Sequence, residues 1–303
     1  MKLWFNKDKV NFNSFCSEQF LLLSFFKENI VKNCNDFENY IDWAKSISNT
    51  VSFTSLEECN YILFPEKLNN NILSYIDKAK RHNKKIIAFY NDDKDAPIAL
   101  DDTVLLYRTS LNSSKRKHNE FSMPAWSRDF NDYVLFEPRH KSIKPVVSFC
   151  GYLSHPLRKL CLEELDSNQN IEKNFIIRDM FWGGKVHDIG LRREYAHNIA
   201  SSDFVLCTRG AGNFSYRFYE TLSAGRIPIF VNSDSILPCD DKINWKNICV
   251  FAERPQDINE AIYTFWSSLT ENGYLKLQET IREIYLNYIS PAGFTKYLSS
   301  LYS

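Results

Sequence analysis

The sequence lacks an excess of charge of either sign, because its 37 Lys and Arg residues balance 37 Asp and Glu residues among 303. Without a strongly basic surface, nucleic acid is not an expected partner, and neither is an anionic membrane as the main partner. The apolar run at residues 20–26 is far shorter than the ~20 residues that span a bilayer. These absences argue against a nucleic-acid-binding protein and against a membrane-spanning one.

Closely spaced cysteine pairs are also missing. The eight cysteines include no Cys-x-x-Cys pair and no nearby His that could complete a zinc site. We therefore expect free thiols in a reducing compartment, and the first residues lack the charged-then-apolar pattern of a secretory signal. No metal cofactor is expected, and the expected location is cytoplasmic.

Short apolar runs of strand length alternate with segments of helical period, a pattern typical of parallel sheets covered by helices. The fold class predicted is therefore α/β. The predicted strands are 61–64, 85–90, 103–107, 133–136, 146–150, 174–177, 203–207 and 227–231. The predicted helices are 14–32, 36–48, 68–82, 156–166, 191–201, 215–224 and most of 258–303, with an irregular connection at 108–130.

A polar segment with two prolines, residues 137–145, is typical of a linker. It predicts an N-terminal Rossmann-like domain at 1–143 and a C-terminal one at 144–303. The helical tail is broken at Ser290–Gly293, and its last helix, about 276–303, is long enough to cross back to the first domain.

The segment Asp203–Val231 is the most informative, because it predicts strand, glycine loop, helix, glycine stop and strand. Gly210 and Gly212 allow a sharp turn and a close approach to a ligand. Ser215 can cap the helix that follows, whose first N–H groups favour an anion such as a diphosphate, and Arg209 adds a fixed charge. Each residue alone is equally consistent with an ordinary turn; together they predict an anion site.

Glu220 lies in the helix of the same segment, five residues after Ser215. Its carboxylate is placed to accept hydrogen bonds from the ribose of a nucleotide whose phosphates sit at the helix start, although a salt-bridge role is the simpler reading. Gly225 is expected to end the helix in the left-handed conformation.

Two strings carry a resemblance to a known family. Leu206–Glu220, continuing through Ala-Gly-Arg-Ile-Pro-Ile-Phe230, resembles the nucleotide-binding segment of GT-B glycosyltransferases and, more closely, the exostosin family, glycosyltransferase family 47. Val146–Leu165 is similar to the same family, which has a strand, a small-residue loop and His-Pro-x-Arg at this place. In this block Ser154 lies in a cap-like position, and Arg158 is a candidate to hold the donor diphosphate together with Arg209. His155 could bond a phosphate or a sugar hydroxyl.

The resemblance covers about residues 58–240 and implies a GT-B-like fold, with two Rossmann-type domains facing each other across a cleft. It implies an inverting glycosyltransferase that moves a sugar from a nucleotide sugar to an acceptor hydroxyl without a metal. Such a displacement needs a base. Candidates in loops of the first domain are Asp92, Asp93 and Glu120, and each could equally be a loop or capping acid.

The resemblance to bacterial exostosin-domain proteins implies a glycan or lipid-linked oligosaccharide acceptor in surface polysaccharide synthesis, such as O-antigen or capsule. It is compatible with peripheral association at the inner face of the membrane. Donor, acceptor and linkage are not carried over.

Several alternatives stay open. Asp93-Lys94-Asp95 fits the Asp-x-Asp pattern by which GT-A transferases hold a divalent metal. An exostosin-like chain could also be a non-catalytic glycan-binding partner of another transferase, or an α/β protein that binds another phosphorylated ligand. Finally, Phe181, Trp182 and Gly183-Gly184 either shape a nucleotide or sugar pocket or form an ordinary aromatic turn.

Overall fold

The structure is a computed structural model that describes residues 1–10, 17–24, 50–185 and 188–302. The chain forms two compact units. Unit 1 consists of Met1–Trp126, Ile236–Cys239 and Asn287–Ser303, and unit 2 consists of Ser127–Ser235 and Asp240–Leu286.

This division differs from the domains predicted at 1–143 and 144–303. The polar segment predicted as a linker belongs to unit 2, where the backbone N–H of Arg139 donates to Gln278 Oε1 (2.9 Å) and its side chain pairs with Asp203 (3.2 Å). The helical tail is divided within a five-residue π-helical turn, Tyr285–Ile289. The residues after Leu286 belong to unit 1.

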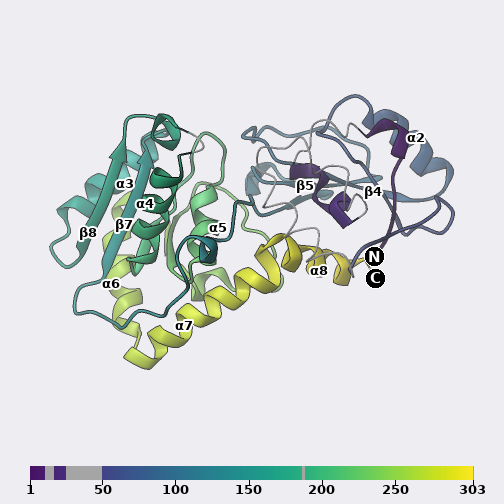
Figure 1. Ribbon diagram of the computed structural model, residues 1–303. Coiled ribbons are helices and arrows are strands. Elements are labelled where there is room, and N and C mark those ends of the chain that lie inside the picture. The colour runs from purple at the N-terminus through teal and green to yellow at the C-terminus, as the bar shows by residue number, and fades with distance from the viewer. Residues whose placement is uncertain (11–16, 25–49, 186–187, 303) are drawn as a thin grey trace. The chain divides into compact units, whose positions relative to one another are not determined.

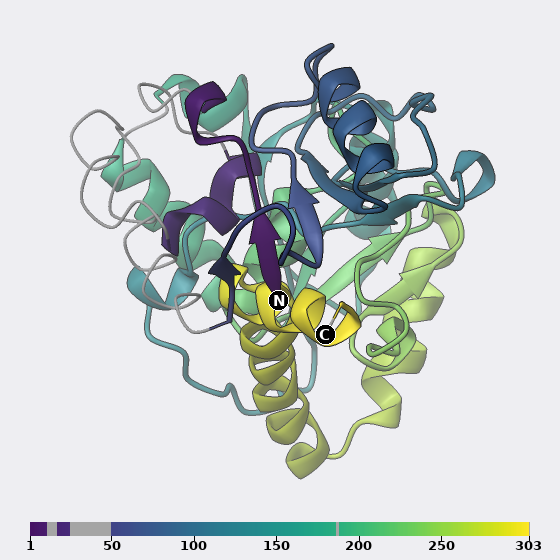
Figure 2. The same cartoon turned by 90° about the vertical axis from the view of Figure 1, so that its right-hand side faces the viewer.

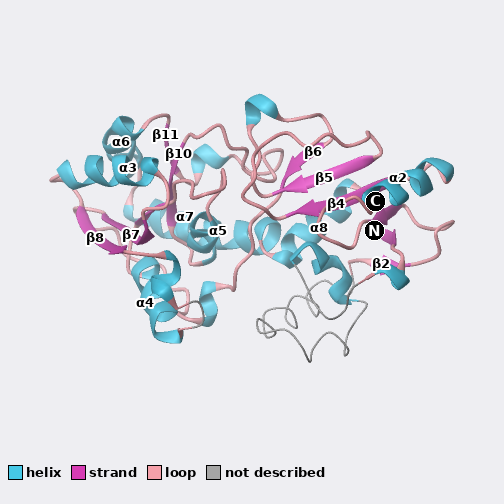
Figure 3. Cartoon of the chain, turned by 90° about the horizontal axis from the view of Figure 1, so that it is seen from above, coloured by secondary structure: helices cyan, strands magenta, loops and turns pink. Residues whose placement is uncertain are grey.

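Unit 1 contains a six-stranded sheet of order β2-β1-β3-β4-β5-β6, in which all neighbouring strands run parallel. Figure 3 shows β4, β5 and β6 side by side. The strands are β1 (Lys2–Trp4), β2 (Ser52–Phe53), β3 (Tyr61–Leu63), β4 (Lys85–Tyr90), β5 (Val104–Arg108) and β6 (Glu120–Ser122).

Helices cover both faces of this sheet. Helix α2 (Ile72–Arg81) buries Ile72, Tyr75 and Ala79 against a cluster that includes Ile86 and Leu106. A second cluster gathers around a short 3-10 helix, Ser17–Ser24, and helix α8 (Pro291–Leu301). In this cluster the ring centroids of Phe20 and Trp126 are 4.3 Å apart, and those of Trp126 and Phe294 are 5.7 Å apart. The amino group of Met1 donates to Ser299, so the two ends of the chain lie close together (Figure 2).

Unit 2 contains a five-stranded parallel sheet of order β11-β10-β9-β7-β8. Figure 3 shows α3 and α6 on one face and α4 on the other. The strands are β7 (Val146–Tyr152), β8 (Glu172–Arg178), β9 (Phe204–Leu206), β10 (Ile227–Val231) and β11 (Val250–Ala252). The helices are α3 (Pro156–Ser167), α4 (Ile189–Ala200), α5 (Tyr216–Ser223), α6 (Ile258–Ser268) and α7 (Glu271–Ile284).

The strand order of unit 2 fixes where a ligand is expected. The chain leaves β7 through α3 to β8 on one side, and then passes through α4 to β9 on the other side of β7 (Figure 1). The order therefore reverses between β7 and β9. In doubly wound α/β sheets, ligands bind at such a switch point, outside the carboxyl ends of the strands.

The α/β class and the two Rossmann-type sheets predicted from the sequence are confirmed. The strand predicted at 133–136 is wrong, because this segment follows a 3-10 turn, Phe130–Asp132, and the Asn131 side chain accepts from the Phe136 N–H. The irregular connection predicted at 108–130 contains β6, and the very short strands β1, β2 and β11 were not predicted. The helix predicted at 36–48 lies outside the described residues, as does most of the one at 14–32.

Gly225 follows the C-cap of α5 with φ of 63°, the left-handed conformation that the sequence predicts. A Cβ atom there would lie 2.2 Å from the ring of Phe136. The glycine therefore ends the helix and also leaves room for the aromatic ring of Phe136, from the segment 133–136 that the sequence predicts as a strand.

Candidate functional site

The predicted anion-binding residues come together at the switch point of unit 2. Arg158, in the first turn of α3, donates from Nη1 to the Tyr152 carbonyl at the end of β7 (2.8 Å). Its Nε donates to the Arg209 carbonyl in the glycine loop after β9 (3.1 Å). A Cβ on Gly210 would lie 3.0 Å from Arg158 Nη2, so the glycine allows the guanidinium to lie against the loop.

The glycine loop itself is held in place on both sides. The N–H of Gly210 donates to the Phe214 carbonyl (3.1 Å), and the side chains of Asn213 and Ser233 bond one another (2.8 Å). Gly210 and Gly212 do not adopt the left-handed conformation. Gly210 is thus favoured because a side chain there would crowd the Arg158 guanidinium, and not because of its backbone conformation.

Two expected helix caps differ from the prediction. Ser215 occupies the N-cap position of α5, but its side chain makes no capping hydrogen bond. At α3 the N-cap residue is His155 rather than Ser154, and His155 Nδ1 accepts from the Leu157 N–H (3.2 Å). The Oγ of Ser154 is buried without a hydrogen-bond partner in the described part of the chain. It lies 3.6 Å from the Cβ position of Gly210.

Arg217, which is not among the residues predicted from the sequence, is the strongest feature of the site. It lies at the second position of α5 and is only 7% exposed. Its Nη2 donates to the Cys150 carbonyl (2.7 Å), and its guanidinium packs on the ring of Phe149 at 4.4 Å. Its Nε and Nη1 are buried without a hydrogen-bond partner among the described residues. Buried N–H groups on a cation are rarely left without an acceptor, so this side chain is prepared for an anion.

A second observation supports an anion at this place. Burial, followed by repulsion from Arg217, lowers the pKa of Arg158 to about 10. Neither guanidinium has a carboxylate within 4.0 Å among the described residues. Two charged arginines therefore face one another without a counter-ion, an arrangement that a doubly charged phosphate group stabilises.

Two other arginines of unit 2, Arg226, which is buried, and Arg282, which is half-buried, donate to well-placed acceptors. Arg226 is 4% exposed and donates to the carbonyls of Ala200 and Glu137 and to Gln278 Oε1. Arg282 makes a two-pronged pair with Asp129, at 2.6 and 2.7 Å. The contrast shows that Arg217 differs from the structural arginines of the same unit.

Glu220 lies on α5 and is 3% exposed. Its Oε2 accepts from the Tyr195 hydroxyl (2.6 Å), and its Oε1 lies 3.4 Å from Arg192 Nη1. A carboxylate has about four lone-pair directions, so ribose hydroxyls can still be accepted beside these partners. The ribose role stays a prediction, and the salt-bridge role is present.

Of the three predicted bases, Glu120 is the least accessible. It is 1% exposed; its Oε1 pairs with Arg108 Nη1 at 2.6 Å, and its Oε2 accepts from the Lys117 N–H at 3.0 Å. Both oxygens are thus engaged in unit 1, and this geometry argues against a base. Sequence reasoning could not find the pair, because the two residues meet only when β5 and β6 align.

Asp92 and Asp93 lie in the loop after β4. Although burial raises the pKa of Asp92, hydrogen bonds from Lys67 and the Lys94 N–H outweigh it, so that the pKa is lowered. Asp93 is exposed, and within the described residues no hydrogen bond or ion pair reaches its carboxylate. Asp93 is therefore the most accessible of the three.

The side chains at the end of β5 and just after it fix the backbone of this loop. Arg108 Nη2 donates to the carbonyls of Lys94 (2.8 Å) and Ala96 (3.0 Å). Thr109 Oγ1 donates to the Asp92 carbonyl and Ser110 Oγ to the Asp93 carbonyl, at 3.3 and 3.2 Å. The run Arg108–Ser110 thus determines where the Asp93 carboxylate emerges.

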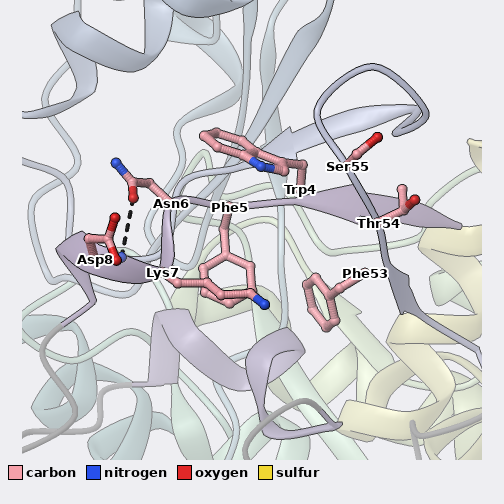
Figure 4. A pocket seen from close by; sticks show the side chains of 8 residues that line it. All are labelled: Trp4, Phe5, Asn6, Lys7, Asp8, Phe53, Thr54 and Ser55. Atoms are coloured by element: carbon pink, nitrogen blue, oxygen red, sulfur yellow. Dashed lines mark hydrogen bonds between the residues drawn. The ribbon is translucent and has the colours of Figure 1, made fainter.

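Unit 1 also contains a pocket of about 480 Å³ at the carboxyl ends of β1 and β2. Figure 4 shows Phe5 and Phe53 on one side of β1 and Trp4 on the other, and the two phenyl rings are 5.2 Å apart. The lining residues are Trp4, Phe5, Asn6, Lys7, Asp8, Phe53, Thr54 and Ser55. Rings beside amide, hydroxyl and carboxylate groups are a lining that suits a polar ligand with apolar faces.

In the described part of the chain, no group of three or more potential metal ligands lies together. Among the helices described, none combines the length and the apolar character needed to cross a bilayer. Cys59, Cys150, Cys161, Cys207, Cys239 and Cys249 form no disulfide with one another, whereas Cys16 and Cys34 lie outside the described residues.

Comparison with known proteins decides the family. The model of the Exostosin GT47 domain matches residues 83–265, more than half of the chain. The chain belongs to the exostosin GT47 family. The matched range of this exostosin-family protein includes every predicted site residue, from Asp92 to Glu220.

Individual relatives match shorter stretches. An Exostosin-1 homolog of Caenorhabditis elegans is 30% identical over 98 residues, which are 32% of this chain and 25% of that protein. Exostosin-1 of Drosophila melanogaster is 37% identical over 62 residues, 20% of this chain and 8% of that protein. The chain thus spans a quarter or less of these relatives. A glycosyltransferase structure from Rickettsia africae aligns over 99% of this chain and 97% of its own, with 11% identity and a TM-score of 0.49.

The cap at α3 gives a testable pH dependence. Burial, followed by the charges of Arg209 and Arg158, lowers the pKa of His155. The folded protein therefore favours the neutral ring that caps the helix. The contribution of this neutral ring to the free energy of unfolding is complete above the pKa of His in the unfolded chain, about 6.5, and is lost as the pH falls through the lower pKa of His155 in the folded protein. In His155→Asn, which keeps a capping acceptor, melting temperatures between pH 5 and 8 should fall less steeply towards acid. Equal slopes for the two proteins would contradict this role of His155.

Proposed function

We propose that this exostosin-family protein is a glycosyltransferase that binds the diphosphate of a nucleotide-sugar donor at the switch point of unit 2. The observation that carries the proposal is Arg217, a buried cation with two unpaired N–H groups beside Arg158 and the start of α5. When the sugar leaves, negative charge grows on the diphosphate, and fixed cations and helix N–H groups stabilise it. Glu220 is the proposed acceptor for the ribose hydroxyls.

The acceptor hydroxyl is proposed to lose its proton to Asp93 in unit 1, with inversion at the anomeric carbon and without a metal. The acceptor is proposed to be a glycan or a lipid-linked glycan of bacterial surface polysaccharide, met in the cytoplasm or at the inner membrane face. The pocket at β1 and β2 is a candidate surface for it, because its rings and polar groups are of the kinds that sugars contact.

The proposal is tested by thermal denaturation with UDP, GDP, CDP, ADP, TDP or inorganic pyrophosphate, each in EDTA and in Mn²⁺. A ligand at a hundredfold excess over its Kd adds about 2.7 kcal/mol to the stability of the native state. We expect one nucleoside diphosphate to raise the melting temperature in EDTA by several degrees. Stabilisation only in Mn²⁺ would favour the Asp-x-Asp alternative with Asp93 and Asp95, and no response to any ligand would overturn the diphosphate site.

The role of Asp93 has its own prediction. Asp93→Asn is expected to lower the turnover number at least about a hundredfold, the lower end of the range for a general base, while the donor Kd stays unchanged. Asp92→Asn, whose carboxylate is already paired with Lys67, is the matched control and should retain most of the turnover. If Asp93→Asn transfers sugar at the normal rate, the base lies elsewhere. A protein that binds nucleotide but transfers no sugar to any acceptor would support the non-catalytic partner.

A further inference from the structure

The turn that follows β8 presents two large aromatic rings to solvent. Phe181 is 54% exposed and Trp182 is 49% exposed, and Met180 beside them is 56% exposed. Large apolar side chains are seldom left exposed side by side on a short turn, and such groups mark contact surfaces. The turn lies outside the carboxyl end of β8, next to β7, because Tyr152 and Arg178 are register partners.

The backbone of this turn is unusual. Trp182 has φ of 57°, in the left-handed region that a bulky residue rarely adopts, and Gly183 and Gly184 follow at 62° and 80°. A Cβ on Gly183 would lie 3.0 Å from the Leu191 side chain and 3.1 Å from Arg178 Nη1. The turn is thus closely packed on its inner side. A tryptophan kept in a strained conformation, where glycine would cost nothing, calls for a functional reason.

Both rings contact partners of the proposed nucleotide site. The ring centroid of Phe181 lies 5.1 Å from that of Tyr152, whose carbonyl accepts from Arg158. The ring of Trp182 lies 5.3 Å from the Arg192 guanidinium, which in turn pairs with Glu220. One ring therefore adjoins the diphosphate contact and the other adjoins the ribose contact.

We propose that Trp182, supported by Phe181, is the platform on which the nucleobase of the donor stacks. This inference rests on the proposed function, because it needs the diphosphate at Arg158 and Arg217 and the ribose at Glu220. A nucleobase is a flat π system joined to the ribose, and an exposed indole offers it a matching face without requiring one particular base. The strained turn and its close inner packing hold the indole ready, so that little freedom is lost on binding.

The test compares two ligands that differ in whether they carry a base. Trp182→Ala is titrated calorimetrically with UDP, GDP, CDP, ADP and TDP, and separately with inorganic pyrophosphate. We expect the best nucleoside diphosphate to bind about tenfold more weakly or worse, as for loss of one base–aromatic stack, and pyrophosphate to bind unchanged. Trp182→Tyr should retain most of the affinity. Tyr263 lies on α6 of the same unit and is 69% exposed, so that Tyr263→Ala removes an exposed aromatic ring elsewhere. This control variant should bind both ligands with unchanged affinity.

Stability gives an independent readout. Trp182→Gly relieves the left-handed backbone, so its melting temperature should be equal to or higher than that of the unaltered protein, while the nucleoside diphosphate binds as weakly as to Trp182→Ala. A marked fall in melting temperature would make Trp182 a structural residue and overturn the platform.

The two proposals fail differently. Unchanged nucleoside diphosphate affinity in Trp182→Ala, with pyrophosphate bound normally, overturns the platform and leaves the diphosphate site standing. An equal loss of affinity for both ligands also overturns the platform, because the turn would then act by shaping the anion site. If the unaltered protein binds neither ligand, the proposed function itself fails.

Discussion

Replacing Arg217 with alanine is expected to weaken nucleoside diphosphate binding at least a hundredfold, with little loss of stability in the free protein. Charge-assisted hydrogen bonds contribute about 1.5–3 kcal/mol each, and Arg217 has two buried N–H groups to offer an anion. In the ligand-free protein the same N–H groups are buried without an acceptor, which costs stability. Removing them therefore regains stability and offsets what is lost with the Cys150 hydrogen bond and the Phe149 contact. Calorimetric titration and thermal denaturation measure the two quantities.

Arg226→Ala is the matched control, because Arg226 is equally buried in unit 2 but every side of its guanidinium is paired. Its loss removes the Arg226 donors from the carbonyls of Ala200 and Glu137 and from Gln278 Oε1, which keeps the Arg139 N–H. It should cost at least about 2 kcal/mol of unfolding free energy, while the nucleotide affinity of the folded protein stays unchanged. Arg217→Lys should not restore binding, since an ammonium does not reproduce the planar fork. If Arg217→Ala behaves as Arg226→Ala does, Arg217 is structural and the diphosphate site is wrong.

The largest effect on stability is expected at the buried pair of Arg108 and Glu120 in unit 1. Both residues are 1% exposed, and Arg108 Nη1 lies 2.6 Å from Glu120 Oε1. Removing one member of a buried pair costs about 3–5 kcal/mol, because the other charge stays in a low-dielectric environment. Arg108→Met should therefore lower the unfolding free energy by this amount and release the loop carbonyls of Lys94 and Ala96.

Hydrogen exchange of the β4 and β5 amides measures this loss within unit 1, without assuming that the two units unfold together. The double variant Arg108→Met/Glu120→Leu should recover much of the stability, since no charge is left unpaired. It should not recover turnover, because the loop that carries Asp93 has still lost Arg108. A cost below about 1 kcal/mol for Arg108→Met would show that the pair is not desolvated as the geometry indicates.

The location of the anion site was partly predictable. Arg158, Arg209 and Gly210 were selected from strings that resemble the exostosin family, and the structure brings them together. Arg217 lies in the same string and was missed. A signal was present, since a cation in the first turn of a helix is opposed by the helix dipole and implies a compensating anion. Its burial, however, depends on Gly151, where a Cβ would lie 2.5 Å from Arg217 Nη2.

The base candidates show where sequence reasoning stopped. Glu120 was chosen as a polar residue in an expected loop, but it lies on β6, beside Arg108 of β5. Twelve residues separate the two along the chain, and only the register of neighbouring strands makes them a pair. Short strands such as β6 and β1 give no hydrophobic period, so that their pairing partners decide whether they form at all.

The features that can be predicted from the sequence are local ones. The alternation of apolar runs and helical segments determined the parallel α/β class, and Gly225 determined a left-handed helix end. These signals act over a few residues, through side-chain period and backbone sterics. The tertiary structure alone decided which cations are buried without a partner, which carboxylates are consumed by ion pairs, and that Asn287–Ser303 join unit 1. The physical reason is that burial and pairing depend on groups brought together from distant parts of the chain, and desolvation acts on them only once they have met.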